Sequence, residues 1–115
     1  MPSKILLIED EEEIHNLIRY ELKGGLDLVS AFSLAEGEKL LEDPNVYSAI
    51  VFDGCVPGNE LNTIPLIQKV VKALYKGPVI AISSFEEYSK HMIEEGCTHI
   101  STKKDVGELI NLLCN

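Results

Sequence analysis

Cysteine is scarce in this sequence of 115 residues, and its pattern argues against two kinds of site. There are three cysteines, Cys55, Cys97 and Cys114, an odd number without a CxxC pair. This pattern favours neither a disulfide framework nor a structural zinc site. We therefore expect a protein of a reducing compartment, the cytoplasm, and we interpret Cys55 as a small space-filling residue.

Positive charge is also scarce, with 10 lysines and arginines against 19 aspartates and glutamates and a formal net charge of −9. Such an acidic chain is not expected to bind nucleic acid or an anionic membrane directly. No apolar run is long enough to span a bilayer. The residues MPSK lead at once into a strand-like run, so we expect no signal peptide. The histidines lack the spacing of metal ligands, and we expect ordinary roles for His15, His91 and His99.

What the sequence does contain is a regular alternation of apolar runs and segments with helical periodicity. Short apolar runs predict five strands, at residues 5–8, 26–32, 47–53, 78–83 and 98–102. The first, third and fourth runs are almost continuously apolar. Such runs are typical of parallel strands that helices cover on both faces.

Five helices are predicted between and after these strands, from apolar residues three or four positions apart. The second is expected to begin with a capping box of Ser33 and Glu36, and the fourth, over 85–95, to end at Gly96. The apolar stripes are Ile14, Leu17, Ile18 and Leu22 in the first helix, Ile64, Ile67, Val71 and Leu74 in the third, and Val106, Leu109, Ile110 and Leu113 in the last.

Five strand–helix units in a chain of this length favour one α/β domain. A closed barrel needs eight such units, so an open doubly wound sheet is expected instead. Right-handed crossovers leave few strand orders, and 2-1-3-4-5 is the common order for five strands. We therefore predict a (βα)5, flavodoxin-like fold over residues 1–115, with a five-stranded parallel sheet and helices on both faces.

Polar or charged residues stand at the carboxyl ends of four of the five predicted strands. They are Glu9 and Asp10 at the end of the first strand, Asp53 at the end of the third, Ser83 and Ser84 at the end of the fourth, and Lys103 at the end of the fifth. The second strand, which lies at the sheet edge in this order, ends in Phe32 and Ser33. Because ligands bind where the carboxyl ends of parallel strands meet, we expect the polar side chains to converge there.

The converging residues have a definite chemistry. Three carboxylates in one crevice cannot all stay ionised without a counter-charge, and a divalent cation such as Mg²⁺, which prefers oxygen ligands, would supply it. Lys103 adds a fixed positive charge and Ser83 a hydroxyl group. Together they would form a receptor for a phosphoryl group, with the Asp53 carboxylate as the nucleophile that forms an acyl phosphate.

The set of Glu9-Asp10, Asp53 in "DGCVPG", Ser83 in "AISS" and Lys103 resembles the receiver domain of bacterial two-component response regulators. The resemblance spans essentially the whole chain. Each motif is weak alone, but the five residues occur in order at matching strand ends. The resemblance implies a phosphoacceptor switch that catalyses only its own phosphorylation and dephosphorylation, rather than an enzyme that turns over a substrate.

In such a domain Asp53 would accept a phosphoryl group from a histidine kinase or a phosphotransfer protein. The resemblance implies that Glu9, Asp10, Asp53 and the Cys55 backbone carbonyl hold Mg²⁺, or Mn²⁺ in its place. Ser83 would bind a phosphoryl oxygen, Lys103 would pair with Asp53 or its phosphate, and Gly54, Ser84 and Phe85 would be neighbours in the phosphoryl pocket.

The resemblance also implies signalling by contact with a downstream protein whose identity is unknown, without direct nucleic-acid or membrane binding. The domain would be a monomer or a phosphorylation-dependent dimer. The chain ends after the fifth predicted helix, so we expect a single receiver domain over 1–115 with no effector domain in this chain, either as a single-domain regulator or as part of a longer protein.

Two residues depart from the family pattern. In the family a proline usually follows the lysine of the site, but here Lys104 follows Lys103. We therefore expect a trans peptide bond between them and a differently shaped loop after the fifth strand. Ile100 stands at the position of the aromatic switch residue that acts with Ser83, so no rotating ring is available to report phosphorylation. We interpret Ile100 as a core residue. We also expect Phe85 to shield the phosphoryl group and Cys55 to position an attacking water poorly, which predicts a long-lived phosphoform.

Two alternatives remain open. One is a pseudo-receiver, a scaffold or dimerisation module that is not phosphorylated, which Ile100 and Lys104 favour and the intact acidic site opposes. The other is a phosphatase with an aspartate nucleophile, although such an enzyme would need an aspartate general acid at position 55. Glu11, Glu12 and Glu13 are attributed to the favourable helix dipole at the start of the first helix, without a function. Because Lys103 and Lys104 are adjacent, the sequence alone does not decide which of the two is the lysine of the site.

Overall fold

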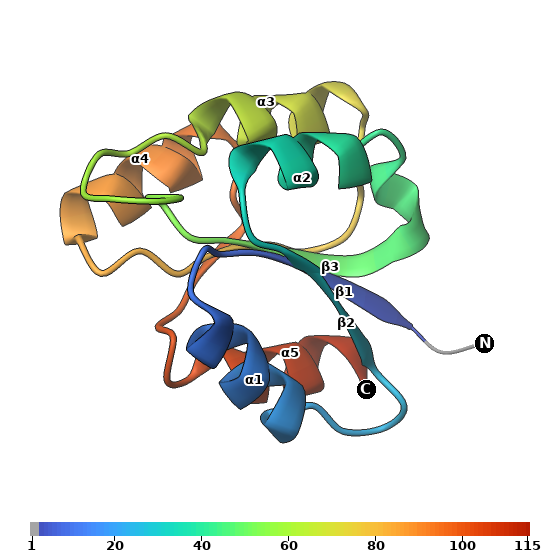
Figure 1. Cartoon of the computed structure of the whole chain (residues 1–115). Helices are drawn as coiled ribbons and strands as arrows, with labels where there is room; N and C mark the ends of the chain where they lie inside the picture. The colour runs from blue at the N-terminus through green and yellow to red at the C-terminus, as the bar shows by residue number, and fades with distance from the viewer. Residues whose placement is uncertain (1–2) are drawn as a thin grey trace.

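Five parallel strands form the centre of the structure, a computed structural model that describes residues 3–115 (Figure 1). The order across the sheet is β2-β1-β3-β4-β5, as predicted. The strands are β1 (Lys4–Ile8), β2 (Asp27–Ala31), β3 (Tyr47–Phe52), β4 (Val79–Ala81) and β5 (His99–Ile100). Met1 and Pro2, on which the expectation about a signal peptide partly rests, lie outside the described residues.

Helices cover both faces of the sheet, as the doubly wound prediction requires. In Figure 1, α2, α3 and α4 lie on one side of the sheet and α1 and α5 on the other. The helices are α1 (Glu12–Glu21), α2 (Leu34–Leu40), α3 (Ile64–Lys72), α4 (Glu86–Glu95) and α5 (Val106–Cys114), with a short 3-10 turn, η1 (Pro44–Val46), before β3. None of the helices within residues 3–115 is both long enough and apolar enough to cross a membrane.

The core has two layers because alternate residues of β1 and β3 face opposite sides of the sheet. One layer packs beneath α2, α3 and α4, and the other against α1 and α5. Burying one such aliphatic side chain contributes roughly 1.5–3 kcal/mol to folding. The fully buried residues of the two strands are Leu6, Ile8, Ile50 and Phe52 in the first layer, and Ile5, Leu7, Ala49 and Val51 in the second. The prediction that these strands are buried on both faces is confirmed.

Helix starts and ends follow local chemistry. Ser33 Oγ accepts a hydrogen bond from the Glu36 N–H at 3.1 Å, which confirms the first half of the predicted capping box. The Glu36 carboxylate accepts from the Phe32 N–H rather than from that of Ser33, so the second half differs from the prediction. Gly96 ends α4 with φ +135°, a conformation that side chains disfavour. The Lys103–Lys104 bond is trans, as predicted, since Val56–Pro57 is the one cis bond within residues 3–115.

Not every residue of the predicted apolar stripes is buried, since Leu17 in α1 and Leu113 in α5 are 43% and 40% exposed. In α3 the buried face contains Leu66, Ile67 and Val70, whereas Val71 is 47% exposed. Leu74 lies beyond the end of this helix and is 75% exposed. The predicted apolar stripe of α3 therefore differs from the buried face of the helix and continues beyond its end.

At the edge of the sheet, β5 has only two residues, and Ile100 is 52% exposed rather than part of the core. An edge strand has a neighbour on one side only, so its side chains are covered less completely than those of central strands. β4 is also shorter than its predicted range, with three residues.

Candidate functional site

A pocket of about 400 Å³ opens at the carboxyl ends of the strands. The predicted residues that line it come from four different strand ends, and the lining also includes Cys55, whose backbone carbonyl was predicted as a metal ligand. They are Asp10, Asp53, Ser83, Ser84, Phe85 and Lys103. Ile100 is not among the lining residues described. The expected convergence of the polar residues at one sheet edge is therefore confirmed.

The three predicted acidic ligands form a cluster. Glu9, Asp10 and Asp53 each offer a carboxylate oxygen within 4.8 Å of the others. Glu9 and Asp53 are buried, since they follow β1 and β3 directly. Burial, and after it the charge of Asp53, raises the pKa of Glu9 to about 8. Burial also raises the pKa of Asp53. The two buried carboxyl groups thus resist being charged at the same time.

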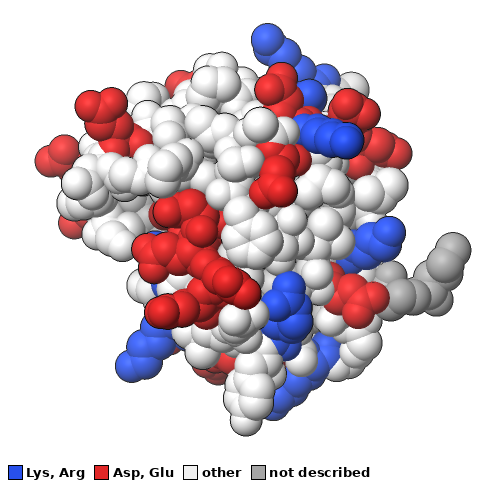
Figure 2. All heavy atoms as spheres, in the orientation of Figure 1, with Lys and Arg blue, Asp and Glu red and all other residues white. Residues whose placement is uncertain are grey.

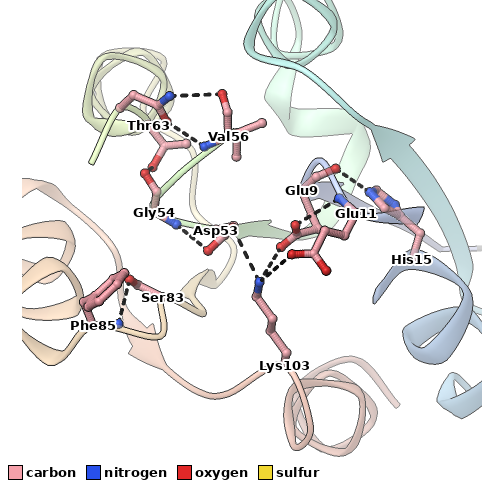
Figure 3. Close-up of polar contacts among 11 residues, drawn as sticks. Glu9, Glu11, His15, Asp53, Gly54, Val56, Thr63, Ser83, Phe85 and Lys103 are labelled. Atoms are coloured by element: carbon pink, nitrogen blue, oxygen red, sulfur yellow. Dashed lines mark hydrogen bonds and ion pairs between the residues drawn. The ribbon is translucent and has the colours of Figure 1, made fainter. Parts of the chain in front are cut away.

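Lys103 provides the counter-charge (Figure 3). Its Nζ lies 3.3 Å from Glu9 Oε2 and 3.7 Å from Asp53 Oδ2. Burial lowers the pKa of Lys103, but the carboxylates of Asp53 and Glu9 outweigh this effect and raise the pKa overall. Lys104 is exposed and does not line the pocket. The open question of register is therefore answered in favour of Lys103.

The carboxylate oxygens at this edge of the sheet are suitable ligands for a hard divalent cation. The three clustered carboxylates have one lysine beside them, which pairs with Glu9 and Asp53, and among the described residues the buried Glu9 Oε2 has no polar partner besides that lysine. Figure 2 shows acidic side chains gathered over the β1–α1 loop and the start of α1. Carboxylate oxygens are ligands that Mg²⁺ and Mn²⁺ accept, and two buried carboxylates that share one lysine are a costly feature unless further positive charge binds them.

The loop after β3 is held in a fixed shape by Asn62. Its side chain accepts a hydrogen bond from the Val56 N–H at 2.8 Å and donates one to the Val56 carbonyl at 3.0 Å. The Gly54 carbonyl accepts from the Asn62 N–H and from the Thr63 hydroxyl. Because the Val56 N–H belongs to the same peptide unit as the Cys55 carbonyl, Asn62 also fixes that carbonyl, the predicted fourth metal ligand.

Gly54 brings the end of β3 against the end of β4. A Cβ atom at position 54 would lie 3.1 Å from Ser83 Oγ, closer than ordinary packing allows. The Gly54 N–H donates to Asp53 Oδ1 at 2.8 Å, which leaves Asp53 Oδ2 facing Lys103. Gly54 therefore orients Asp53 and lets Ser83 approach it.

The outer side of the pocket is formed by aromatic residues. The Phe85 N–H donates to Ser83 Oγ at 3.2 Å, and the Phe85 ring stacks edge-on against Tyr88 at 5.2 Å between centroids. The Tyr88 hydroxyl donates to the Asn59 carbonyl at 2.9 Å, which ties α4 to the β3–α3 loop. Phe85 is 49% exposed, so it borders the pocket without closing it.

Sequence reasoning missed two residues near the site. Glu11 was attributed entirely to the helix dipole, but it lines the pocket and its Oε1 lies 4.0 Å from Lys103 Nζ. Glu12 and Glu13 are exposed and do not line the pocket, in agreement with the prediction.

His15 is fully buried and hydrogen-bonded to the Glu9 carbonyl, and its burial lowers its pKa. The sequence did contain a signal for this burial. His15 lies three residues before Ile18, so both residues lie on the face of α1 that turns inward.

Comparison with known proteins was informative at the level of structure only. No family model matches the sequence, and no curated protein was found as a relative. The structure is similar to the receiver domain of the Francisella response regulator 1452, with a TM-score of 0.75 and 24% identity over 96% of this chain and 95% of that one. It is also similar to a CheY-like receiver domain protein from Methanospirillum hungatei JF-1, with a TM-score of 0.78, 20% identity and coverage of 97% and 93%.

A longer protein also matches. The chain superimposes on part of NtrX from Brucella abortus with a TM-score of 0.77 and 23% identity, over 96% of this chain and 26% of that one. These likenesses show that the chain has the fold of response regulator receiver domains.

Proposed function

We propose that this chain is a receiver domain of a two-component system and that Asp53 accepts a phosphoryl group from a phosphohistidine. The histidine would belong to a histidine kinase or a phosphotransfer protein. The observation that carries the proposal is the carboxylate cluster of Glu9, Asp10 and Asp53, with Lys103 beside it, at the carboxyl edge of a receiver-type fold.

The reaction follows from the orientation of Asp53. A carboxylate oxygen of Asp53 attacks the phosphorus, a new O–P bond forms, and the P–N bond to the donor histidine breaks, which gives an aspartyl phosphate. The Gly54 N–H holds one oxygen of Asp53, so the carboxylate is already oriented before the donor arrives. The domain catalyses its own phosphorylation and dephosphorylation and does not turn over a separate substrate.

Lys103 and Ser83 contribute to binding of the phosphoryl group. Lys103 Nζ lies between Glu9 and Asp53 and would pair with the negative charge on the transferred group. The Ser83 hydroxyl accepts a hydrogen bond from Phe85, so its own proton is free to be donated to a phosphoryl oxygen. Ser84 borders the same space, and Gly54 lies against Ser83.

Glu9, Asp10, Asp53 and the Cys55 carbonyl would hold Mg²⁺, or Mn²⁺ in its place. When bound, the cation neutralises negative charge on the phosphoryl oxygens. The proposed phosphoform is long-lived, because Phe85 borders the pocket and Cys55 offers no carboxylate or amide to orient a water molecule.

The proposed output is contact with a downstream protein, without direct nucleic-acid or membrane binding, by a cytoplasmic domain that is a monomer or dimerises on phosphorylation. Ser83 would respond to the phosphoryl group. Ile100 has no ring to rotate and lies exposed on the edge strand, so the change would have to pass through the β4–α4 segment that contains Phe85.

A pseudo-receiver is the second candidate. The observation in its favour is that Lys103 already pairs with Glu9, Glu11 and Asp53, so the acidic cluster has a counter-charge even without a metal.

A phosphatase is less well supported. Burial raises the pKa of the Cys55 thiol, which makes it a poor replacement for a carboxylic acid at the position of the general acid.

One experiment separates these functions. The protein is incubated with acetyl phosphate and Mg²⁺, and its intact mass is measured together with the phosphate released. Asp53→Asn is the test variant, and Asp27→Asn, an exposed aspartate at the start of β2, is the matched control.

A single phosphoryl adduct that disappears only in Asp53→Asn is the expected result for a receiver. No adduct and no Mg²⁺ binding would indicate the pseudo-receiver, and phosphate release over many turnovers would indicate the phosphatase.

A further inference from the structure

His15 is a fully buried histidine that lies directly behind the acidic cluster (Figure 3). It lies in the first turns of α1 and points toward the end of β1, where its Nε2 is 2.7 Å from the Glu9 carbonyl oxygen. Its Nδ1 is 2.8 Å from Ser30 Oγ on β2. The ring also packs against Phe32, with 4.2 Å between ring centroids. The imidazole is therefore held on three sides.

The direction of each hydrogen bond follows from the partners. A carbonyl oxygen only accepts, so His15 Nε2 carries the proton and donates to Glu9. In the neutral ring Nδ1 is then an acceptor, and the Ser30 hydroxyl donates to it. Ser30 Oγ in turn accepts from Arg19 Nη2 at 3.1 Å. The result is a directed chain from Arg19 on α1, through β2, to the backbone of Glu9.

This chain fixes the residue that holds the buried carboxylate. The Glu9 N–H donates to the Ala31 carbonyl at 3.0 Å, while His15 occupies the Glu9 carbonyl, so both backbone groups of Glu9 are bound. The Glu11 N–H occupies Glu9 Oε1. The remaining oxygen, Oε2, is the one that faces Lys103 and has no hydrogen-bond partner.

We propose that His15 is a positioning residue for the divalent-cation site, which it serves by holding the Glu9 backbone so that Glu9 Oε2 points into the carboxylate cluster. This inference rests on the proposed function, because it assumes that the cluster binds Mg²⁺. A glutamate side chain has more rotatable bonds than an aspartate, so its free oxygen is aimed only if its backbone is fixed. Partners that orient metal ligands in this way are worth roughly 10–100-fold in metal affinity.

The test compares Mg²⁺ affinity, measured by calorimetry, with the stability of the metal-free fold, measured by urea unfolding. His15→Leu removes the donor to Glu9, whereas His15→Gln keeps an N–H group at a similar distance from the backbone. The matched control is Ile18→Ala, which removes a fully buried side chain one turn further along the same face of α1 without touching Glu9. Ser30→Ala removes the support of the other ring nitrogen and serves as a milder variant if His15→Leu does not fold.

The expected result is that His15→Leu weakens Mg²⁺ binding by about 10-fold or more, that His15→Gln recovers most of the affinity, and that Ser30→Ala gives a smaller loss. Ile18→Ala should lower stability and leave Mg²⁺ affinity unchanged. In the wild type, Mg²⁺ should shift the nitrogen resonances of the His15 ring and leave those of the exposed His91 in place.

Wild-type affinity in a folded His15→Leu or Ser30→Ala variant would overturn the inference and leave the proposed function intact. An equal loss in Ile18→Ala would also overturn it, because the effect would then come from stability alone. A wild-type protein that binds no Mg²⁺ would overturn the proposed function and this inference together.

Discussion

At the β1 and β3 side of the carboxyl edge, Glu9 and Asp53 are buried, and hydrogen bonds from His15 and Asn62 hold the backbone around them. At the β4 and β5 side, the strands have three and two residues, and Ile100 is exposed. The first side would hold the cation and carry the phosphoryl group on Asp53, and the second side, with Ser83 and Lys103, would contact that group and respond to it. The difference suggests that binding relies on a rigid half of the site and signalling on a half that costs little to rearrange.

The largest effect is expected from removing one charge in the rigid half. Asp10→Asn should weaken Mg²⁺ binding by more than about 100-fold. Residues that only hydrogen-bond to a metal ligand contribute up to about 100-fold, and loss of a direct ligand should cost more. Glu12→Gln is the control, since it removes a nearby exposed charge that does not line the pocket. Calorimetric titration with Mg²⁺ measures both. Equal affinities in the two variants would show that the cluster is not the metal site.

A smaller loss is expected when the β3–α3 loop is released. Asn62→Ala leaves the Val56 N–H and carbonyl without their partners, and we expect the free energy of unfolding to fall by about 1–3 kcal/mol. Mg²⁺ affinity should fall too, because the Cys55 carbonyl is no longer fixed. Asn59→Ala, in the exposed part of the same loop, should leave stability within about 0.5 kcal/mol of the wild type. Urea unfolding distinguishes them, and equal stabilities of the two variants would contradict the rigid-loop account.

In the responding half, Phe85→Ala is expected to change the lifetime of the phosphoform more than the stability of the fold. The half-exposed ring borders the pocket, so its removal should admit water and shorten the lifetime measured by the decay of the phosphoryl adduct. Tyr88→Phe keeps the stacked ring but loses the hydrogen bond to Asn59, and it should have a lifetime close to that of the wild type. A lifetime in seconds for the wild type itself would contradict the shielding by Phe85.

The smallest effect is expected at Ile100. Ile100→Thr should change the free energy of unfolding by no more than about 0.5 kcal/mol and leave the rate of phosphorylation unchanged, because the side chain is exposed and outside the pocket. The rate of adduct formation with acetyl phosphate and a urea titration check both statements. A large loss in either measurement would mean that the edge strand belongs to the rigid half.

The same contrast explains which features could be predicted from sequence. The strands β1 and β3 are buried on both faces, so they appear in the amino-acid sequence as continuous apolar runs that can be recognised without a structure. Their order, and therefore the meeting of Glu9 and Asp53 at one edge, follows from general rules of parallel sheets. Lys103 and Ser83 were found in the same way.

The features that could not be predicted depend on contacts between distant segments. The role of His15 depends on Ser30, and the position of Glu11 depends on Lys103, a residue far along the chain that follows β5. Neither pairing leaves a periodic pattern in the sequence. The exposure of Ile100 depends on β5 being short and at the edge, and an apolar residue in a strand-like run gives no sign of this.

The measurement that tests the central proposal most directly is the location of the phosphoryl group. After incubation with acetyl phosphate and Mg²⁺, borohydride reduction converts an aspartyl phosphate into homoserine, which peptide mass spectrometry can place in the sequence. We expect homoserine at position 53, dependent on Mg²⁺, and aspartate retained at positions 10, 27, 43 and 105. Homoserine at another aspartate, or none under conditions in which Mg²⁺ binds, would contradict the proposal that Asp53 is the phosphoacceptor.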